Sequence, residues 1–228
     1  MATAASETTR RPALDARGHG RRRRLVAPGL AFAMATALAT ALAPSPAAAE
    51  DFRAGDTARL DAGEIILRTT EVAGSELPRA TVWAVIDAPL ARIWAVIDRC
   101  ADYKRTMVRV LASEELSRKG DVVTCRITVD MPWPFDDLTA TTRATHTIDP
   151  GKRHRRAWTL VEGDYKRNEG SWTFVPWQGA AERTLAIYSV HAEPNIAIPV
   201  AIQRRASRTT LPNLITQLRK VSGAKPRP

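Results

Sequence analysis

The chain has 228 residues, 44% of them hydrophobic, and a formal net charge of +10 at pH 7. Seven of its 34 basic residues lie within the first 49, so 27 basic and 22 acidic side chains remain beyond that segment, a modest positive balance that argues against a nucleic-acid partner. The remaining length, about 180 residues, suits one domain with its own hydrophobic core.

The first 49 residues have the organisation of a secretory signal peptide. Four arginines at 21–24 precede the apolar stretch Leu25–Ala43, and the small-residue site Ala47–Ala49 follows. This order predicts a periplasmic or secreted protein, cleaved near Ala49. An uncleaved membrane anchor is the alternative, but the stretch is only weakly hydrophobic because it is rich in Ala and Thr and contains Gly and Pro. Export by the general or the twin-arginine route stays open.

The next segment, 50–78, is predicted as a polar lead-in with an edge strand at Glu64–Val72. Arg79–Asp87 is rich in β-branched and aromatic residues and predicts the first main strand. Asp87 as the N-cap and Pro89 in the first turn predict the start of a short helix. Its apolar residues recur at helical spacing: Leu90, Ile93, Trp94 and Ile97. A second short helix or turn is expected at 100–107.

From Val108 to Ala192 the pattern is that of consecutive antiparallel strands. Apolar and polar residues alternate along Val122–Met131 and along Leu138–Ile148, as half-exposed strands require. The turns Arg118–Asp121 and Asp149–Lys152 end the preceding strands. The remaining predicted strands are Val108–Leu116, Arg155–Val161, Ser171–Trp177 and Arg183–Ala192.

The longest helical pattern after the leader is Asn195–Val221. Leu211, Ile215 and Leu218 recur at spacings of three and four and form one face. A curved antiparallel sheet has one hydrophobic face to cover, and this helix is the element available to cover it. We therefore predict an α+β fold in which the sheet wraps around the C-terminal helix, with a cavity between them. The domain is expected over 79–222, with a short basic tail at 223–228.

Five segments carry a resemblance to a known family. They are Val85–Pro89, Ile93–Ile97, Ala101–Tyr103, Met131–Phe135 and Thr210–Leu214. Together they resemble the START-like superfamily, also called polyketide cyclase/dehydrase, Bet v 1-like or SRPBCC proteins, and bacterial coenzyme Q-binding and cyclase-type members in particular. The resemblance implies the helix-grip fold, with two short helices after the first main strand and a deep apolar cavity.

What the resemblance implies about function is a binding or transport protein for a hydrophobic small molecule, such as a lipid, a sterol-like compound or an isoprenoid quinone. The alternatives are a cyclase/dehydrase-type enzyme acting on a polyketide-like substrate in the same cavity, and an interaction module with a filled core. No cofactor is expected, and the oligomeric state stays open. The residues expected to line or gate the cavity are Val123, Ile127, Val129, Met131, Trp133, Phe135, Ala140, His146, Trp158, Trp172, Ile198 and Ile202.

The tryptophans are expected to divide into two groups. Trp83 and Trp94 fall on apolar patterns and are predicted to be ordinary core residues. Trp133 and Phe135 lie in a proline-bounded loop beside two aspartates. Exposed aromatic residues in such a loop suit a gate for the cavity or a transient contact with a membrane surface.

Among the polar residues, His146 is a candidate for acid/base chemistry, because it falls on the apolar face of its strand. The alternative is a core histidine with satisfied hydrogen bonds. The other candidates for a catalytic base are carboxylates at strand ends or in loops, Asp136, Asp137, Glu162 and Asp164, for which exposed turn residues are the alternative. His154 and His191 are predicted to be solvated, as is the basic run 152–156. The spacing of His and Cys fits no metal site. Cys100 and Cys125 form either a disulfide or two buried thiols.

Overall fold

The computed structural model describes residues 53, 55–196 and 198–224. The chain divides into two compact units, Met1–Pro44 and Ser45–Pro228, and all described residues belong to the second. The predicted leader and its cleavage site near Ala49 lie outside the described residues, as do the last four positions of the predicted basic tail.

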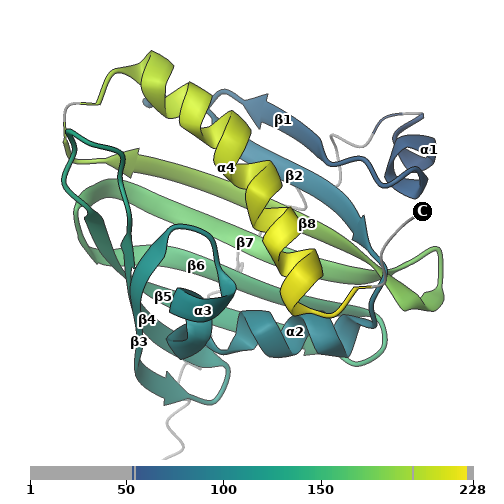
Figure 1. The fold of residues 1–228 in the computed structure, drawn as a ribbon. Coiled ribbons are helices and arrows are strands. Elements are labelled where there is room, and N and C mark those ends of the chain that lie inside the picture. Colours follow the sequence, from purple (N-terminus) through teal and green to yellow (C-terminus); the bar gives the residue numbers. More distant parts are fainter. Residues whose placement is uncertain (1–52, 54, 197, 225–228) are drawn as a thin grey trace, which may run out of the picture. The chain divides into compact units, whose positions relative to one another are not determined.

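The second unit consists of short helices, a long run of strands and a long final helix (Figure 1). In chain order the elements are α1 (Asp56–Asp61), β1 (Ile66–Thr70), β2 (Arg79–Ile86), α2 (Leu90–Asp98), a 3₁₀ turn (Cys100–Asp102), α3 (Tyr103–Thr106), β3 (Val110–Lys119), β4 (Val122–Val129), β5 (Leu138–Asp149), β6 (Arg153–Gly163), β7 (Tyr165–Trp177), β8 (Ala180–Pro194) and α4 (Val200–Val221). The strands form an eight-stranded sheet in the order β1-β2-β8-β7-β6-β5-β4-β3. Neighbouring strands are antiparallel throughout. The predicted α+β helix-grip fold is confirmed.

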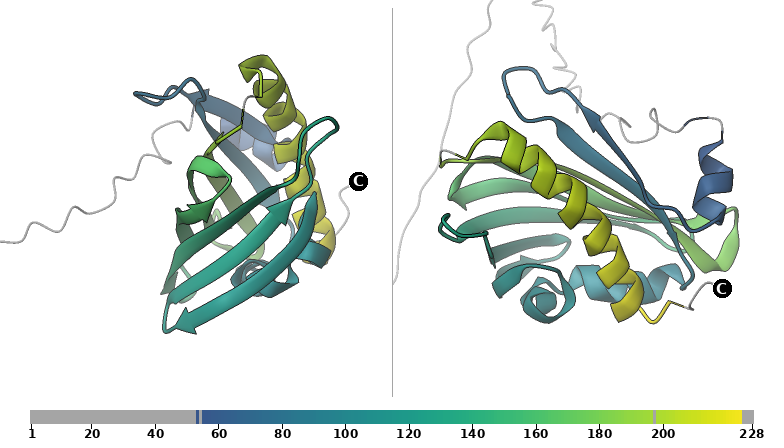
Figure 2. Two further views of the ribbon diagram at one scale, coloured as in Figure 1. Left: turned by 90° about the vertical axis from the view of Figure 1, so that its left-hand side faces the viewer. Right: turned by 45° about the horizontal axis from the view of Figure 1, so that its top comes forward.

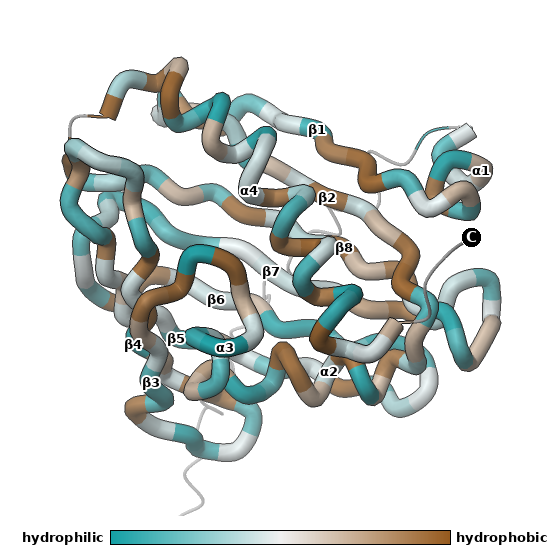
Figure 3. Tube along the Cα trace, in the orientation of Figure 1, coloured by the Kyte–Doolittle hydropathy of each residue, from teal (hydrophilic) through white to brown (hydrophobic). Residues whose placement is uncertain are grey.

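Helix α4 lies across one face of the curved sheet, with α2 and α3 beside its C-terminal half (Figures 1 and 2). Hydrophobic and hydrophilic residues alternate along α4 (Figure 3), and the buried ones are Leu211, Ile215 and Leu218. The predicted apolar face is therefore confirmed. Within the described part of the chain, neither α4 nor a shorter helix combines the length and the apolar character needed to cross a bilayer.

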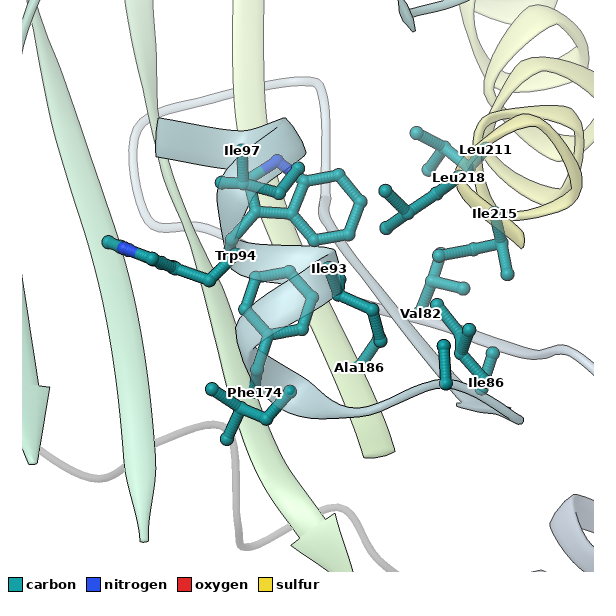
Figure 4. Close-up of a cluster of buried hydrophobic side chains, with 14 of the residues drawn as sticks. Val82, Ile86, Ile93, Trp94, Ile97, Phe174, Ala186, Leu211, Ile215 and Leu218 are labelled. Carbon is teal, nitrogen blue, oxygen red and sulfur yellow. The ribbon is translucent and has the colours of Figure 1, made fainter. Parts of the chain in front are cut away.

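The main core is formed where α4, α2 and the sheet meet (Figure 4). Ile215 and Leu218 of α4 point toward Val82 of β2, and Ile93 of α2 packs into the same cluster. Trp94 also belongs to this cluster and is buried, as predicted. Because side chains alternate along a strand, every second residue of β2, β7 and β8 faces this core and the residues between them face the opposite side of the sheet.

A smaller core covers part of the opposite face and includes a helix that the polar lead-in did not predict. Leu60 of α1 is fully buried against Trp83, which confirms the prediction that Trp83 is a core residue. Asp56 at the start of α1 accepts a hydrogen bond of 2.7 Å from Arg68 of β1. This hydrogen bond with Arg68 lowers the pKa of Asp56 to about 2. Thus α1 and β1 pack with the segment that follows Arg79.

The start of α2 differs from the prediction. The helix begins at Leu90, preceded by Pro89, and no side chain caps it. Asp87, predicted as the N-cap, instead accepts a hydrogen bond of 3.1 Å from Nε of Arg183 on β8. The N-cap assignment was wrong because the carboxylate binds the guanidinium of a distant strand, a partner that local sequence does not reveal.

Cys100 and Cys125 are joined as a disulfide in the structure, with their Cα atoms 6.3 Å apart. Cys100 lies in the 3₁₀ turn and Cys125 on β4, and both are fully buried. The bridge therefore ties the segment between α2 and α3 to the inner face of the sheet, beside the cavity described next.

Candidate functional site

A cavity of about 230 Å³ lies between the middle of α4 and the face of the sheet that α4 covers. Thr210, Leu211 and Leu214 of α4 cover it, and strands β3 to β8 form most of its wall. Its other lining residues are Tyr103, Met107, Val108, Val110, Ile127, Val129, Ala140, Thr142, Arg156, Trp158, Tyr165, Asn168, Trp172 and Tyr188. The wall is mainly apolar, with few polar groups, as in most small-molecule sites.

Small and large side chains share the wall. Ala140 of β5 is small, which leaves space in front of the strand. Trp158 of β6 stacks on Tyr188 of β8, with ring centroids 5.8 Å apart. Gly170 of β7 makes this possible, because a Cβ there would lie 2.5 Å from the Trp158 ring. Aromatic rings from β6, β7 and β8 therefore pack together on one side of the cavity.

Five of the twelve residues predicted for the cavity and its gate line it: Ile127, Val129, Ala140, Trp158 and Trp172. The periodicity of the strands identified their face correctly. Periodicity did not identify which stretch of each strand lies beside the cavity, so the other predicted residues lie outside the cavity wall. Val123 is buried beside the disulfide, and Ile198 is buried just before α4. Trp133 and Ile202 are exposed, and Met131 and Phe135 are partly buried in or near the loop between β4 and β5.

Sequence reasoning missed two kinds of lining residue. One kind comes from irregular segments, such as Met107 and Val108 between α3 and β3, where no period marks the inward side. The other kind is polar, such as Arg156 and Asn168 on strands. For Arg156 the sequence did contain a signal. Arg156 and Trp158, which was predicted to line the cavity, are two residues apart on β6 and therefore share a face of the sheet.

Arg156 is the buried charged residue among the lining residues that sequence reasoning did not predict. Only 3% of it is exposed, so the prediction that the whole basic run 152–156 is solvated was wrong for this arginine. Its Nη1 donates to Nε2 of His146 over 2.6 Å, and its Nη2 lies 3.1 Å from Sγ of Cys125. The guanidinium also lies over the ring of Tyr103, 5.9 Å from the centroid.

His146 does not line the cavity but stands directly behind Arg156. Its Nδ1 lies 3.1 Å from Oδ1 of Asp98 at the end of α2. Asp98 in turn accepts from Arg118, which also pairs with Glu115 over 2.8 Å. These contacts fit the neutral histidine that carries its proton on Nδ1. His146 is thus a core histidine with both nitrogens partnered, in a chain of charges that runs from the cavity wall to the surface.

The environment of His146 opposes its protonation. Burial, and then the nearby Arg156 guanidinium, lower the pKa of His146 to about 4, although Asp98 acts in the other direction. The imidazole is therefore neutral at pH 7 and accepts the Arg156 hydrogen bond.

We expect folding stability to fall by about 3 kcal/mol as the pH drops from 6.5 to 4, because the unfolded chain protonates His146 before the folded protein does. Above pH 6.5 this contribution is complete. Urea denaturation at pH 7 and at pH 4.5 measures it. His146→Gln keeps an acceptor for Arg156 but does not titrate, so it is expected to flatten the pH dependence. An unchanged slope in that variant would assign the effect to other groups.

Of the other two histidines of the domain, His191 is buried and His154 is partly buried, so the prediction that both are solvated was wrong for His191 and holds only in part for His154. The ring of His154 packs edge-on against Trp94, with centroids 5.2 Å apart, and burial lowers its pKa. His191 is fully buried, and its Nε2 lies 3.1 Å from Oγ of Ser75. Both lie near strand ends, His154 on the face of the sheet that packs against Trp94 and His191 on the opposite face, beside the segment that joins β1 to β2. Across the described residues, no three His, Cys, Asp or Glu side chains are grouped to hold a metal ion.

Two tyrosines add neutral donors to the wall. Burial raises the pKa of Tyr165 to about 12 and raises that of Tyr188 further. Both hydroxyls therefore keep their protons at neutral pH and are able to donate hydrogen bonds. The hydroxyl of Tyr103 is already engaged, since it donates to the carbonyl of Ile97 over 2.6 Å.

Exposed apolar side chains gather at one end of the sheet. Trp133 in the β4–β5 loop is 92% exposed, and Ile196 and Ile202 at the start of α4 are also exposed. Backbone hydrogen bonds of 2.8 Å join Asn195 to Asp164, and Asp164 to the start of β5. These bonds hold the β4–β5 loop, the β6–β7 turn and the start of α4 at the same end of the sheet (Figures 1 and 2).

Several solved structures share this fold. A STAR-related lipid transfer protein from Xanthomonas axonopodis is 20% identical, with a TM-score of 0.62 over 70% of this chain and 93% of its own. Human STARD10 is 12% identical, with a TM-score of 0.60 over 75% and 70% of the two chains. The Zhui aromatase/cyclase from Streptomyces sp. R1128 is 17% identical, with a TM-score of 0.51 over 69% and 93%.

No curated protein sequence matches the chain. The model of a protein family does, and it is described as polyketide cyclase / dehydrase and lipid transport. The match spans residues 86–219, more than half of the chain, and covers all residues that line the cavity, and α4 except for its last two residues. The predicted START-like resemblance is therefore confirmed, and the chain belongs to the polyketide cyclase/dehydrase and lipid-transport family.

Proposed function

We propose that this protein binds a hydrophobic small molecule in the cavity beneath α4. The observation that carries the proposal is the cavity itself, about 230 Å³ of space walled mainly by aromatic and aliphatic side chains. An apolar ligand that fills the cavity removes the apolar surface of this wall from water. That burial stabilises the complex by about 25 cal/mol per Å² of buried surface. The family description, which includes lipid transport, supports the same class of ligand.

Binding or transport is favoured over cyclisation. The family description names cyclases and dehydrases beside lipid transport, so an enzyme is the alternative. A cyclase that removes a proton from its substrate needs a base in contact with it. Among the described residues that line the cavity there is neither a carboxylate nor a histidine, the Tyr165 and Tyr188 hydroxyls keep their protons, and His146 is separated from the space by Arg156.

We also propose that the protein is exported, on the strength of its leader sequence alone. Native mass spectrometry of the protein purified from its own host tests both proposals at once. A mass matching cleavage near Ala49 supports export, and a mass for the whole chain opposes it. A co-purifying mass that extracts into organic solvent supports ligand binding. A bare polypeptide that also takes up no lipid, sterol or quinone on incubation would overturn the binding proposal.

The exposed apolar end of the sheet is proposed to touch a membrane surface during loading or release. Trp133 is almost wholly exposed, as an interfacial anchor requires, and Arg204, Arg205 and Arg208 near the start of α4 favour anionic headgroups.

We expect Trp133→Ala to weaken binding to vesicles containing anionic phosphatidylglycerol by about tenfold, because insertion of the indole buries apolar area. Co-sedimentation with vesicles measures the effect, and a blue shift of tryptophan fluorescence in the unmodified protein accompanies it. Leu116→Ala, at an exposed position on the edge strand β3, is the matched control and leaves binding unchanged. Equal binding by the unmodified protein and Trp133→Ala would remove Trp133 from the contact.

A further inference from the structure

We propose that the ligand is an apolar acid, whose carboxylate or equivalent anionic oxygen binds Arg156 while its hydrocarbon body fills the cavity. This inference rests on the proposed function and specifies its ligand. Among the described residues that line the cavity, Arg156 is the only one with a charged side chain.

A buried guanidinium calls for a partner. Arginine stays protonated in proteins, and burying a charge is costly unless it is paired. Only 3% of Arg156 is exposed, yet within the described part of the chain it forms no ion pair. Its two hydrogen-bond partners are a neutral imidazole and a disulfide sulfur, and a disulfide sulfur is a weak acceptor.

The acidic groups of the network lie on the far side of His146. Asp98 contacts the Nδ1 of His146 and pairs with Arg118, and Glu115 pairs with Arg118 as well. The chain from Arg156 to Glu115 thus contains two cations and two anions, with both anions toward the surface. Its positive end is the one that faces the cavity.

The guanidinium also keeps the geometry needed to hold an anion. Of its five N–H groups, the observed contacts use one on Nη1 and one on Nη2. Three donors remain, and a carboxylate accepts such donors in pairs. Around this single charge the wall is formed by residues such as Ile127, Val129 and Leu214, which suit an alkyl or ring body. An apolar molecule with one acidic end matches both features.

Decanoate and 1-decanol test the proposal, because they have the same carbon chain and differ at the polar end. Isothermal titration at pH 7.5 is expected to show decanoate binding about tenfold to a hundredfold more tightly than decanol. In Arg156→Met, which keeps an unbranched apolar side chain in the wall, this advantage falls to within about twofold while the affinity for decanol is kept. Arg155→Met is the matched control. Arg155 is adjacent on β6, faces the other side of the sheet and leaves the preference unchanged.

Arg156→Lys provides a second measurement that does not depend on the folding of the methionine variant. It keeps the charge but loses the paired donors, so part of the preference for decanoate is retained. Equal binding of decanoate and decanol by the unmodified protein would overturn the acid proposal and leave the binding proposal intact. If neither compound binds, and no other apolar probe does, the proposed function itself fails.

Discussion

Leu214→Trp is expected to weaken the binding of apolar ligands by about a hundredfold while the protein stays folded. Leu214 lies on α4 above the cavity and is only partly buried, so a larger side chain there has open space to enter. The indole would occupy much of the room that a ligand needs in a cavity of about 230 Å³. Titration with the neutral fluorescent probe N-phenyl-1-naphthylamine measures the loss, and a thermal melt reports folding.

Asn213→Trp is the matched control for this prediction. Asn213 precedes Leu214 on the same helix, but its side chain is exposed and does not line the cavity. This variant adds the same indole and is expected to bind the probe as the unmodified protein does. If Leu214→Trp bound the probe with unchanged affinity, the ligand would occupy some other part of the molecule.

Sequence periodicity was sufficient for the fold because each buried surface repeats regularly. The stripe through Leu211, Ile215 and Leu218 predicted the covered face of α4, and alternation predicted the inner faces of β4 and β5. Helix α1 was not predictable in this way. It has six residues and buries two, Leu60 and Asp56. Leu60 packs against Trp83 of β2 and Asp56 binds Arg68 of β1, both from later strands.

The site was harder to predict than the fold because its key residue was hidden among similar ones. The sequence predicted one solvated basic run that includes Arg153, Arg155 and Arg156. Because neighbouring side chains of β6 face opposite sides of the sheet, Arg155 lies on one face and the buried Arg156 on the other. Sharing a face with Trp158 was the available signal for Arg156. The sequence placed His146 correctly on the inner face of β5. It did not show that His146 contacts Asp98 of α2 and Arg156 of β6, which make it a partner of Arg156 and keep it out of the cavity wall.

Phe174→Ala is expected to produce the largest loss of stability, about 4 kcal/mol, as is usual when a fully buried phenylalanine is truncated. Phe174 stacks on Trp172, with ring centroids 5.6 Å apart, and meets the edge of Trp94 at 6.5 Å. Trp94 in turn lies against the rings of His146 and His154. A void at Phe174 therefore opens at the centre of an aromatic cluster whose large, rigid rings have little freedom to close it.

Urea denaturation at pH 7 measures this loss of stability, and two further variants serve for comparison. Phe174→Leu keeps most of the apolar volume and is expected to cost well under half as much. Thr173→Ala changes the neighbouring residue, whose side chain faces the other side of the sheet, and is expected to cost less than about 1 kcal/mol. Because Trp172 is both a neighbour of Phe174 and part of the cavity wall, Phe174→Ala should also weaken ligand binding. A large loss of stability with unchanged affinity would mean that the core and the cavity wall are mechanically independent.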